Sequence, residues 1–148
     1  VCMNSVSSSS KTVAIIGGGP SGLVCAKEAK ACGLVPTIFE KGSDFGGIWN
    51  SHTGKTWDSM RINNSYHSLS FSDYEWPEET EDFPDQKSVY DYLCSYAKTF
   101  EIREHALFNA RVTGIQKISD QWQVEWINAK NKTKSATFDM VIVCSGIF

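Results

Sequence analysis

Short apolar runs separated by a helix-length segment set out the first third of the chain. Thr12–Gly17 is apolar, rich in β-branched residues and closed by glycines, which is typical of a buried strand in a parallel sheet. Pro20–Gly33 carries small apolar residues at helical spacing and ends at a glycine, so it predicts a helix. Val35–Glu40 is a second apolar run that ends in a carboxylate. This order predicts a βαβ unit and a parallel sheet.

The pattern then changes twice. Lys41–Asp85 has little periodicity and is rich in Gly, Ser, Asn, Trp and Pro, and ordered loops of this length are usually functional. Ser88–Phe100 has the apolar face of a helix, and Ser88 with Asp91 has the form of a capping box at its start. We therefore expect a long functional loop that ends in a helix.

The last part of the chain predicts strands of two kinds. Alternating apolar positions predict an antiparallel meander over Ala106–Ile118, Gln121–Ile127 and Thr133–Phe138. Met140–Cys144 is continuously apolar and predicts a return to the parallel sheet. The expected fold class is α/β: a Rossmann-like parallel sheet with helices on its faces and a small antiparallel meander inserted.

Composition excludes some classes of function but does not identify one. The 148 residues are enough for one domain, and 41% hydrophobic with 21% charged residues is ordinary for a soluble globular protein. A net charge of -3 argues against a nucleic-acid partner, and no run approaches the roughly 18 apolar residues of a membrane span. The Ser-rich residues 1–11 lack the apolar centre of a secretory signal, so we expect a disordered leader before a single domain at 12–148.

The cysteines and histidines predict neither a disulfide framework nor a metal site. The five cysteines are an odd number without a C-x-x-C pair, and the three histidines are scattered. Cys25, Cys32, Cys94 and Cys144 lie in apolar segments, where we expect buried free thiols. We therefore expect no metal and a cytoplasmic location.

The main chemical motif joins the first strand to the first helix. Gly17-Gly18-Gly19-Pro20-Ser21-Gly22 matches G-x-G-x-x-G in the strand–turn–helix context that the motif requires. Gly17 permits the tight turn, Gly19 leaves room for a pyrophosphate, and Gly22 lets the helix pack closely on the strand. The helix N-terminus offers unpaired N–H groups and its positive dipole end to phosphates.

A carboxylate completes the predicted dinucleotide site. Glu40 lies about eighteen residues after Gly22, where it can accept hydrogen bonds from ribose hydroxyls and repel a 2′-phosphate. The motif therefore predicts FAD or NAD. The alternative is a glycine-rich turn without a ligand and a surface glutamate.

Further segments resemble a known family. Thr-Ile-Phe-Glu-Lys and Phe-Gly-Gly-Ile-Trp follow the glycine-rich turn, and Gly46-Gly47-x-Trp49 is their most specific element. Together they resemble flavin-containing monooxygenases, and more distantly their Baeyer–Villiger relatives. Ser59–Pro77, Tyr90–Phe100 and Val141–Gly146 resemble later segments of that family, so the resemblance covers nearly everything after residue 11.

The resemblance implies a set of cofactor-binding residues. Gly17–Ser21 would hold the FAD pyrophosphate and Glu40 the adenosine ribose. Ile48 and Trp49 would contact the flavin side, and Val112 would meet adenine through its backbone, although Trp49 could equally be a core aromatic. The remaining contacts that the resemblance implies are Gly22, Lys41, Gly47, Asn63, Asn64, Ser145 and Gly146.

The resemblance also implies the chemistry. The family reduces FAD with NADPH, and the reduced flavin captures O2 as a C4a-hydroperoxide whose distal oxygen passes to a nitrogen or sulfur atom of a small-molecule substrate. A neutral amide such as Asn63 can donate and accept hydrogen bonds there without protonating the peroxide, so Asn63 is the expected catalytic residue. The neighbouring Asn64 is the alternative, and both asparagines could instead be ordinary turn residues.

The family continues beyond this sequence with a second glycine-rich motif for NADPH. We therefore expect the chain to be the first third of such an enzyme, with an incomplete fold at its C-terminus and no turnover without the missing C-terminal part. Two other function classes stay open. One is another FAD oxidoreductase, such as an amine oxidase or a disulfide reductase; the other is a non-catalytic nucleotide-binding module.

Overall fold

A computed structural model describes residues 10–146, so the expected leader at 1–11 lies almost wholly outside the described residues. The strands of the first sheet are β1 (Thr12–Ile16), β2 (Val35–Phe39), β3 (Ala106–Leu107) and β7 (Met140–Val143). Those of the second sheet are β4 (Arg111–Ile118), β5 (Gln121–Ile127) and β6 (Thr133–Phe138). The longer helices are α1 (Pro20–Ala31) and α3 (Gln86–Thr99), and the short ones are η1 (Gly47–Trp49), η2 (Ser51–Thr53), α2 (Tyr66–Leu69) and η3 (Arg103–His105).

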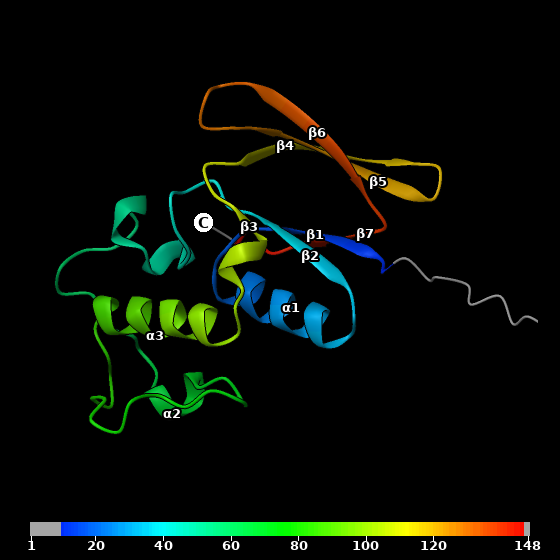
Figure 1. The fold of residues 1–148 in the computed structure, drawn as a ribbon. Helices are drawn as coiled ribbons and strands as arrows, with labels where there is room; N and C mark the ends of the chain where they lie inside the picture. Colours follow the sequence, from blue (N-terminus) through cyan, green and yellow to red (C-terminus); the bar gives the residue numbers. More distant parts are fainter. Residues whose placement is uncertain (1–9, 147–148) are drawn as a thin grey trace, which may run out of the picture.

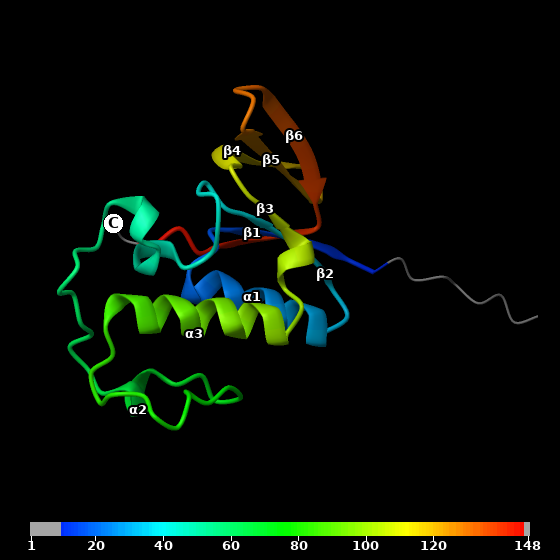
Figure 2. The same ribbon diagram turned by 60° about the vertical axis from the view of Figure 1, so that its left-hand side comes forward.

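The elements form three layers. The middle layer is a four-stranded parallel sheet in the order β3-β2-β1-β7. Helices α1 and α3 lie on one face of this sheet, and the antiparallel sheet β4-β5-β6 lies on the other (Figures 1 and 2). The expected α/β fold, with its parallel sheet and antiparallel meander, is confirmed.

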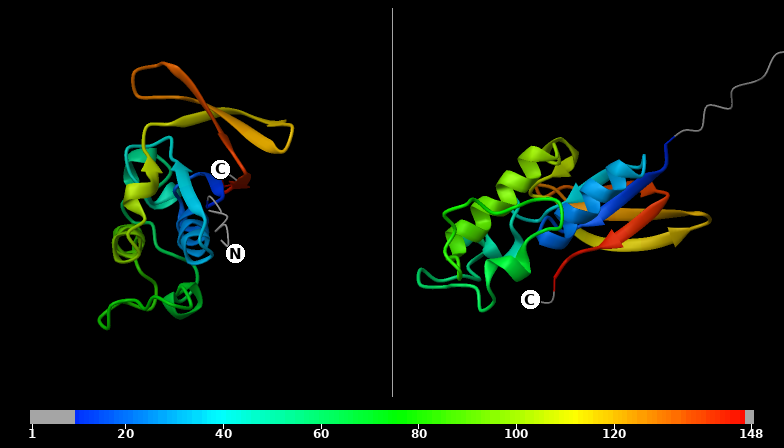
Figure 3. Two further views of the ribbon diagram at one scale, coloured as in Figure 1. Left: turned by 45° about the vertical axis from the view of Figure 1, so that its right-hand side comes forward. Right: turned by 90° about the horizontal axis from the view of Figure 1, so that it is seen from below.

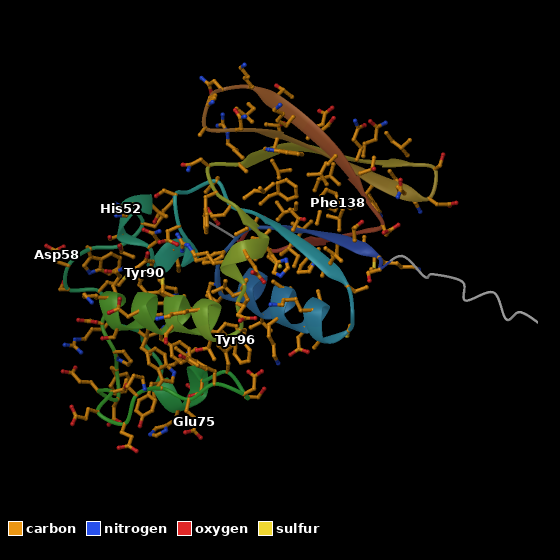
Figure 4. All side chains as sticks on the ribbon, viewed as in Figure 1. His52, Asp58, Glu75, Tyr90, Tyr96 and Phe138 are labelled. Carbon is orange, nitrogen blue, oxygen red and sulfur yellow. The ribbon has the colours of Figure 1, made fainter. Side chains whose placement is uncertain are left out.

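Alternation along β1 explains how one strand serves both faces of the sheet. Val13 and Ile15 are fully buried in the cluster under the helices, whereas Ala14 is fully buried in the cluster between the two sheets. Phe39 belongs to the second cluster, and its ring meets that of Phe138 at 5.7 Å between centroids. Figure 4 shows Phe138 in the space between the two sheets.

Helix α1 begins and ends as its sequence predicts. Pro20 is the first helical residue, and proline suits this position because a backbone N–H there would have no acceptor within the helix. Gly33 follows the helix with φ +75°, and its N–H donates to the Lys30 carbonyl at 2.9 Å. The Leu34 N–H donates to the Ala29 carbonyl at 2.9 Å, which completes a Schellman ending.

The expected first strand of the meander is wrong at its start. Ala106–Leu107 pairs in parallel with Ile38–Phe39 and so belongs to the other sheet. Asn109, with φ +52°, then turns the chain, and the Ala110 N–H donates to the Glu40 carbonyl at 2.9 Å. The meander therefore begins only at Arg111.

The start of α3 and the burial of one thiol also differ from expectation. The capping residue is Asp85 rather than Ser88, because its carboxylate accepts the Ser88 N–H at 2.8 Å. Asp91, expected in a capping box, pairs with Lys87 instead. Cys32 is exposed because it ends α1 on the outside, whereas Cys25, Cys94 and Cys144 are half-buried. None of the helices among residues 10–146 is long and apolar enough to cross a bilayer.

Candidate functional site

The carboxyl ends of three parallel strands meet at one edge of the sheet. Ile16 at the end of β1 lies beside Phe39 of β2 and Val143 of β7. The described chain leaves β7 at this edge, and Figure 3 shows β7 in the same sheet as β1 and β2. In open α/β sheets this edge is the usual ligand-binding crevice.

The glycine-rich turn at this edge has no room for side chains. A Cβ on Gly17 would lie 2.9 Å from the Cys144 carbonyl carbon, and Gly17 also has φ +111°. A Cβ on Gly22 would overlap the Gly17 carbonyl oxygen and lie 3.0 Å from its carbon. The N-cap of α1 is Gly19, which offers no side chain to the first N–H groups of the helix. Those donors are thus available to an anion.

Glu40 connects this turn to the end of β2. Its side chain is 7% exposed, and Oε2 accepts the Gly18 N–H at 2.7 Å while Oε1 accepts the Gly42 N–H at 2.6 Å. A carboxylate has about four acceptor positions, so two remain for other donors such as hydroxyl groups. The backbone of Glu40 is held as well, because its N–H donates to the Leu107 carbonyl at 3.0 Å.

A second glycine turn lies against the first. The Gly46 N–H donates to the Gly18 carbonyl at 3.0 Å, and a Cβ on Gly47 would lie 3.0 Å from the Gly19 Cα. Both Gly46 (φ +112°) and Gly47 (φ +56°) have left-handed backbones that favour glycine. The two turns therefore form one continuous wall without side chains.

Charged and polar groups hold the loop that leads into this second turn. Burial opposes ionisation of Asp44, but its ion pair with Arg103 at 2.7 Å and its hydrogen bond from the Phe45 N–H lower the pKa of the carboxyl below its ordinary value. The Tyr90 hydroxyl donates to Asp44 at 3.2 Å, and burial raises the pKa of that phenol. Asp44 is thus ionised at neutral pH and ties the loop to α3 and η3.

Asn50 anchors the next segment. It is 3% exposed, and its Nδ2 donates to the Phe45 carbonyl at 3.1 Å while its Oδ1 accepts the His52 N–H at 3.0 Å. The preceding residue, Trp49, accepts a hydrogen bond on its carbonyl from the Gln86 side chain of α3. Asn50 therefore joins the second glycine turn to η2.

A cavity of about 250 Å³ opens between these elements. Its lining residues come from the end of β2, the second glycine turn, the η2 segment and the residue after β7. They are Glu40, Lys41, Gly42, Ser43, Gly47, Ile48, Asn50, His52, Thr53, Lys55 and Ser145. The cavity thus runs from the predicted ribose residue to a predicted flavin contact.

The structure brings some of the predicted cofactor residues to this cavity and leaves others away from it. Glu40, Lys41, Gly47, Ile48 and Ser145 line it. The predicted contacts that do not line it are Gly17, Gly18, Gly19, Pro20, Ser21, Gly22, Trp49, Asn63, Asn64, Val112 and Gly146. Of the first turn, Gly19 and Pro20 lie against Gly47, so these two residues are next to the wall of the cavity.

The other predicted cofactor contacts lie outside the cavity, in different parts of the fold. Trp49 packs against the core under the helices, as its alternative interpretation proposed. Asn63 and Asn64 are exposed in the loop before α2, and their roles stay predictions. Val112 is half-buried beside a bulge in the β4–β5 ladder, two residues after the Ala110 that binds the Glu40 carbonyl. Gly146 is exposed with φ +79°.

Sequence reasoning missed several lining residues. His52, Thr53 and Lys55 follow a motif that ends at Trp49, and nothing in their spacing predicts a site. The one available indication was Asn50, a polar residue directly after an apolar aromatic in a loop that was expected to be functional. Within residues 10–146, no three metal-type side chains gather as a possible metal site.

Comparisons with known proteins decide the family. A family model described as flavin-binding monooxygenase-like matches residues 10–148. The chain belongs to this family. Membership confirms the resemblance to flavin-containing monooxygenases and gives flavin, rather than NAD, as the cofactor of the family.

Relatives from distant organisms share this segment. Flavin-containing monooxygenase 5 of Oryctolagus cuniculus is 35% identical, with 92% of this chain and 27% of the relative covered. A 4-hydroxybenzoate brominase (decarboxylating) of Pseudoalteromonas luteoviolacea is 35% identical, with 93% and 26% covered. The structure of S-allyl-L-cysteine S-oxygenase from Allium sativum matches with a TM-score of 0.85 and 29% identity, with 93% and 37% covered. The chain spans about a quarter of the length of these curated relatives.

Proposed function

We propose that this chain is the FAD-binding portion of an NADPH-dependent flavin monooxygenase that oxygenates nitrogen or sulfur atoms of small molecules. The observation that carries the proposal is the buried carboxylate of Glu40, which accepts the Gly18 N–H of the glycine-rich turn at 2.7 Å. This contact supports the proposal, because a dinucleotide requires a ribose acceptor close to the turn that holds its phosphates.

The residues at the site fit FAD. A Cβ at Gly17 or Gly22 would collide with neighbouring backbone, so the turn has no side chains at these positions. The N-terminus of α1 can then donate its N–H groups to the pyrophosphate. Glu40 uses its remaining acceptor positions for the ribose hydroxyls, and Ile48 bounds the cavity on the flavin side. Bound FAD supplies the oxygen-transfer chemistry, while the chain binds and orients it.

The remaining parts of the proposal come from the family. Asn63, or its neighbour Asn64, donates and accepts hydrogen bonds near the flavin ring without releasing a proton. The reaction consumes NADPH and O2, and the third partner is a small amine or sulfur compound; no metal and no nucleic acid take part. The cytoplasmic location expected from the cysteine pattern belongs to the same proposal.

Flavin absorption of the purified chain tests the cofactor site. The chain is incubated with FAD and desalted, and its visible spectrum is compared with that of Glu40→Ala and of a matched surface variant, Glu104→Ala on η3. We expect flavin bands with the native chain and with Glu104→Ala, and weaker bands with Glu40→Ala. Flavin retained equally by all three would show that Glu40 is not a cofactor residue, and no retention by the native chain would contradict the proposal.

Addition of NADPH in air tests whether this chain binds only FAD or also the hydride donor. The sequence contains one G-x-G-x-x-G motif, which FAD occupies in this proposal, so we expect NADPH to leave the flavin bands of this chain unbleached. Bleaching would show that the chain also binds the hydride donor, and that the proposal that it binds FAD alone is wrong.

A further inference from the structure

The segment after Asn50 forms a wall of the cavity that the glycine motifs do not provide. His52 and Lys55 line the cavity from this segment, and Lys41 lines it from the end of β2 (Figure 4 shows His52 on η2). Glu40 is the only carboxylate among the lining residues, and both of its oxygens already accept backbone N–H groups. The lining residues therefore include two lysines and one carboxylate that is already hydrogen-bonded.

These lysines differ from the cations elsewhere in the described chain that have carboxylate partners. Lys27 pairs with Asp73, Lys87 with Asp91 at 2.5 Å, and Arg103 with Asp44 at 2.7 Å. Neither Lys41 nor Lys55 has a carboxylate within 4.0 Å among residues 10–146. The two exposed lysines thus line the cavity without an ion-pair partner among residues 10–146.

Hydrogen bonds that Asn50 accepts order the segment that carries Lys55. The Asn50 carbonyl accepts the Thr53 N–H at 3.0 Å and the Thr53 hydroxyl at 2.8 Å. The Gly54 N–H donates to the Ser51 carbonyl at 3.2 Å, and Gly54, with φ +67°, reverses the chain just before Lys55. The backbone of this turn is therefore held at a defined distance from the second glycine turn.

We propose that Lys55 is a phosphate-binding residue and that the Ser51–Lys55 turn is a second phosphate wall, opposite the glycine-rich turns. This inference rests on the proposed function. A dinucleotide with its ribose at Glu40 and its flavin beyond Ile48 must pass its diphosphate through the space between them, where Lys55 supplies positive charge. A lysine suits this role because its ammonium group acts as a point charge with three donors and needs no fixed orientation.

Binding of three ligands that differ in phosphate content tests the assignment. FAD, ADP and riboflavin are titrated into the native chain, Lys55→Gln, Lys55→Arg and Lys134→Gln, followed by calorimetry at about 20 mM salt. Lys134 on β6 provides the same charge change on an exposed strand. We expect Lys55→Gln to weaken FAD and ADP about three- to five-fold, as for an exposed ion pair, while Lys55→Arg and Lys134→Gln bind as the native chain does. Riboflavin, which has no phosphate, should bind all four proteins alike.

Each outcome bears on one of the two proposals. If the native chain binds FAD and Lys55→Gln binds it equally well, or if Lys134→Gln loses as much, then Lys55 is not a phosphate residue although the FAD site stands. If Lys55→Gln also weakens riboflavin, the residue acts on the structure and not on the phosphate. If the native chain binds none of the ligands, the proposed function fails and this inference fails with it. At about 300 mM salt the loss in Lys55→Gln should shrink, because screening weakens an exposed charge pair.

Discussion

Gly22→Ala is the substitution for which the structure gives the clearest expectation. In most helices alanine is more favourable than glycine by about 1 kcal/mol. At Gly22 the added Cβ would overlap the Gly17 carbonyl oxygen and would lie 3.7 Å from the Cys144 Cβ. Backbone cannot rotate away as a flexible side chain can, so α1 must move off the end of β1.

The size of the effect follows from that displacement. Inserting a methyl group into a packed site costs about 1–3 kcal/mol, which outweighs the helix preference for alanine. At the upper value of about 3 kcal/mol, about 2 kcal/mol remains after the helix preference for alanine is subtracted. For a chain of this size each kcal/mol lowers the melting temperature by roughly 3–4 °C, so we expect a decrease of up to about 6–8 °C. FAD binding should weaken as well, because the first turn of α1 carries the phosphate donors.

Thermal unfolding followed by circular dichroism measures this, with Gly114→Ala as the matched control. Gly114 lies in β4, where an added Cβ would stand 3.5 Å from the Glu125 carboxylate, an ordinary contact. The control should melt at or above the native temperature. A Gly22→Ala variant that melts as high as the native chain would show that close helix–strand packing at this glycine is not required.

Three further predictions address the same structure. Glu40→Ala leaves the Gly18 and Gly42 N–H groups without their acceptor, so the free energy of unfolding in urea should fall by roughly 2–4 kcal/mol; an unchanged urea midpoint would refute the buried carboxylate. The hydrogen bond from the Ser88 N–H lowers the pKa of Asp85 below its ordinary 3.8, so its contribution to stability is complete above that pH and is lost as the pH falls through the lowered pKa. Asp85→Asn should keep the cap and flatten that part of the acid unfolding curve, whereas a native-like pH dependence in the variant would assign the effect to another group. Burial and the neighbouring Cys25 thiol raise the pKa of Cys144 to about 11, so iodoacetamide at neutral pH should alkylate exposed Cys32 well before Cys144, and equal rates by peptide mass mapping would contradict this.

Local patterns in the sequence predicted much of the fold and the first half of the site. The strands β1 and β2, helix α1 and the glycine-rich turn each depend on residues close together in the chain. Glu40 was found for the same reason, because its place follows from the length of one βαβ unit.

The predictions are wrong or incomplete where contacts between residues far apart in the sequence determine the structure. Ala106–Leu107 has the alternation of a meander strand, but its pairing with Ile38–Phe39 assigns it to the parallel sheet. Asp85 and Ser88 are both good capping residues, and the Gln86 N–H bond to the Met60 carbonyl at 3.0 Å, from a remote part of the loop, favours the earlier start. Lys55 reaches the cavity only because Asn50 folds the preceding segment, which no spacing rule describes.

The position of β7 connects the candidate site to an edge of the parallel sheet. Within residues 10–146, β7 pairs with β1 on one side only, and Val143 near its open edge is 65% exposed. Such an edge is a template on which another strand can add. The strand leads directly to Ser145, which lines the cavity, so a strand that pairs with β7 also influences the position of a residue at the cavity. Because linkage is reciprocal, a cofactor that favours one position of Ser145 changes the affinity of β7 for a neighbouring strand by the same factor.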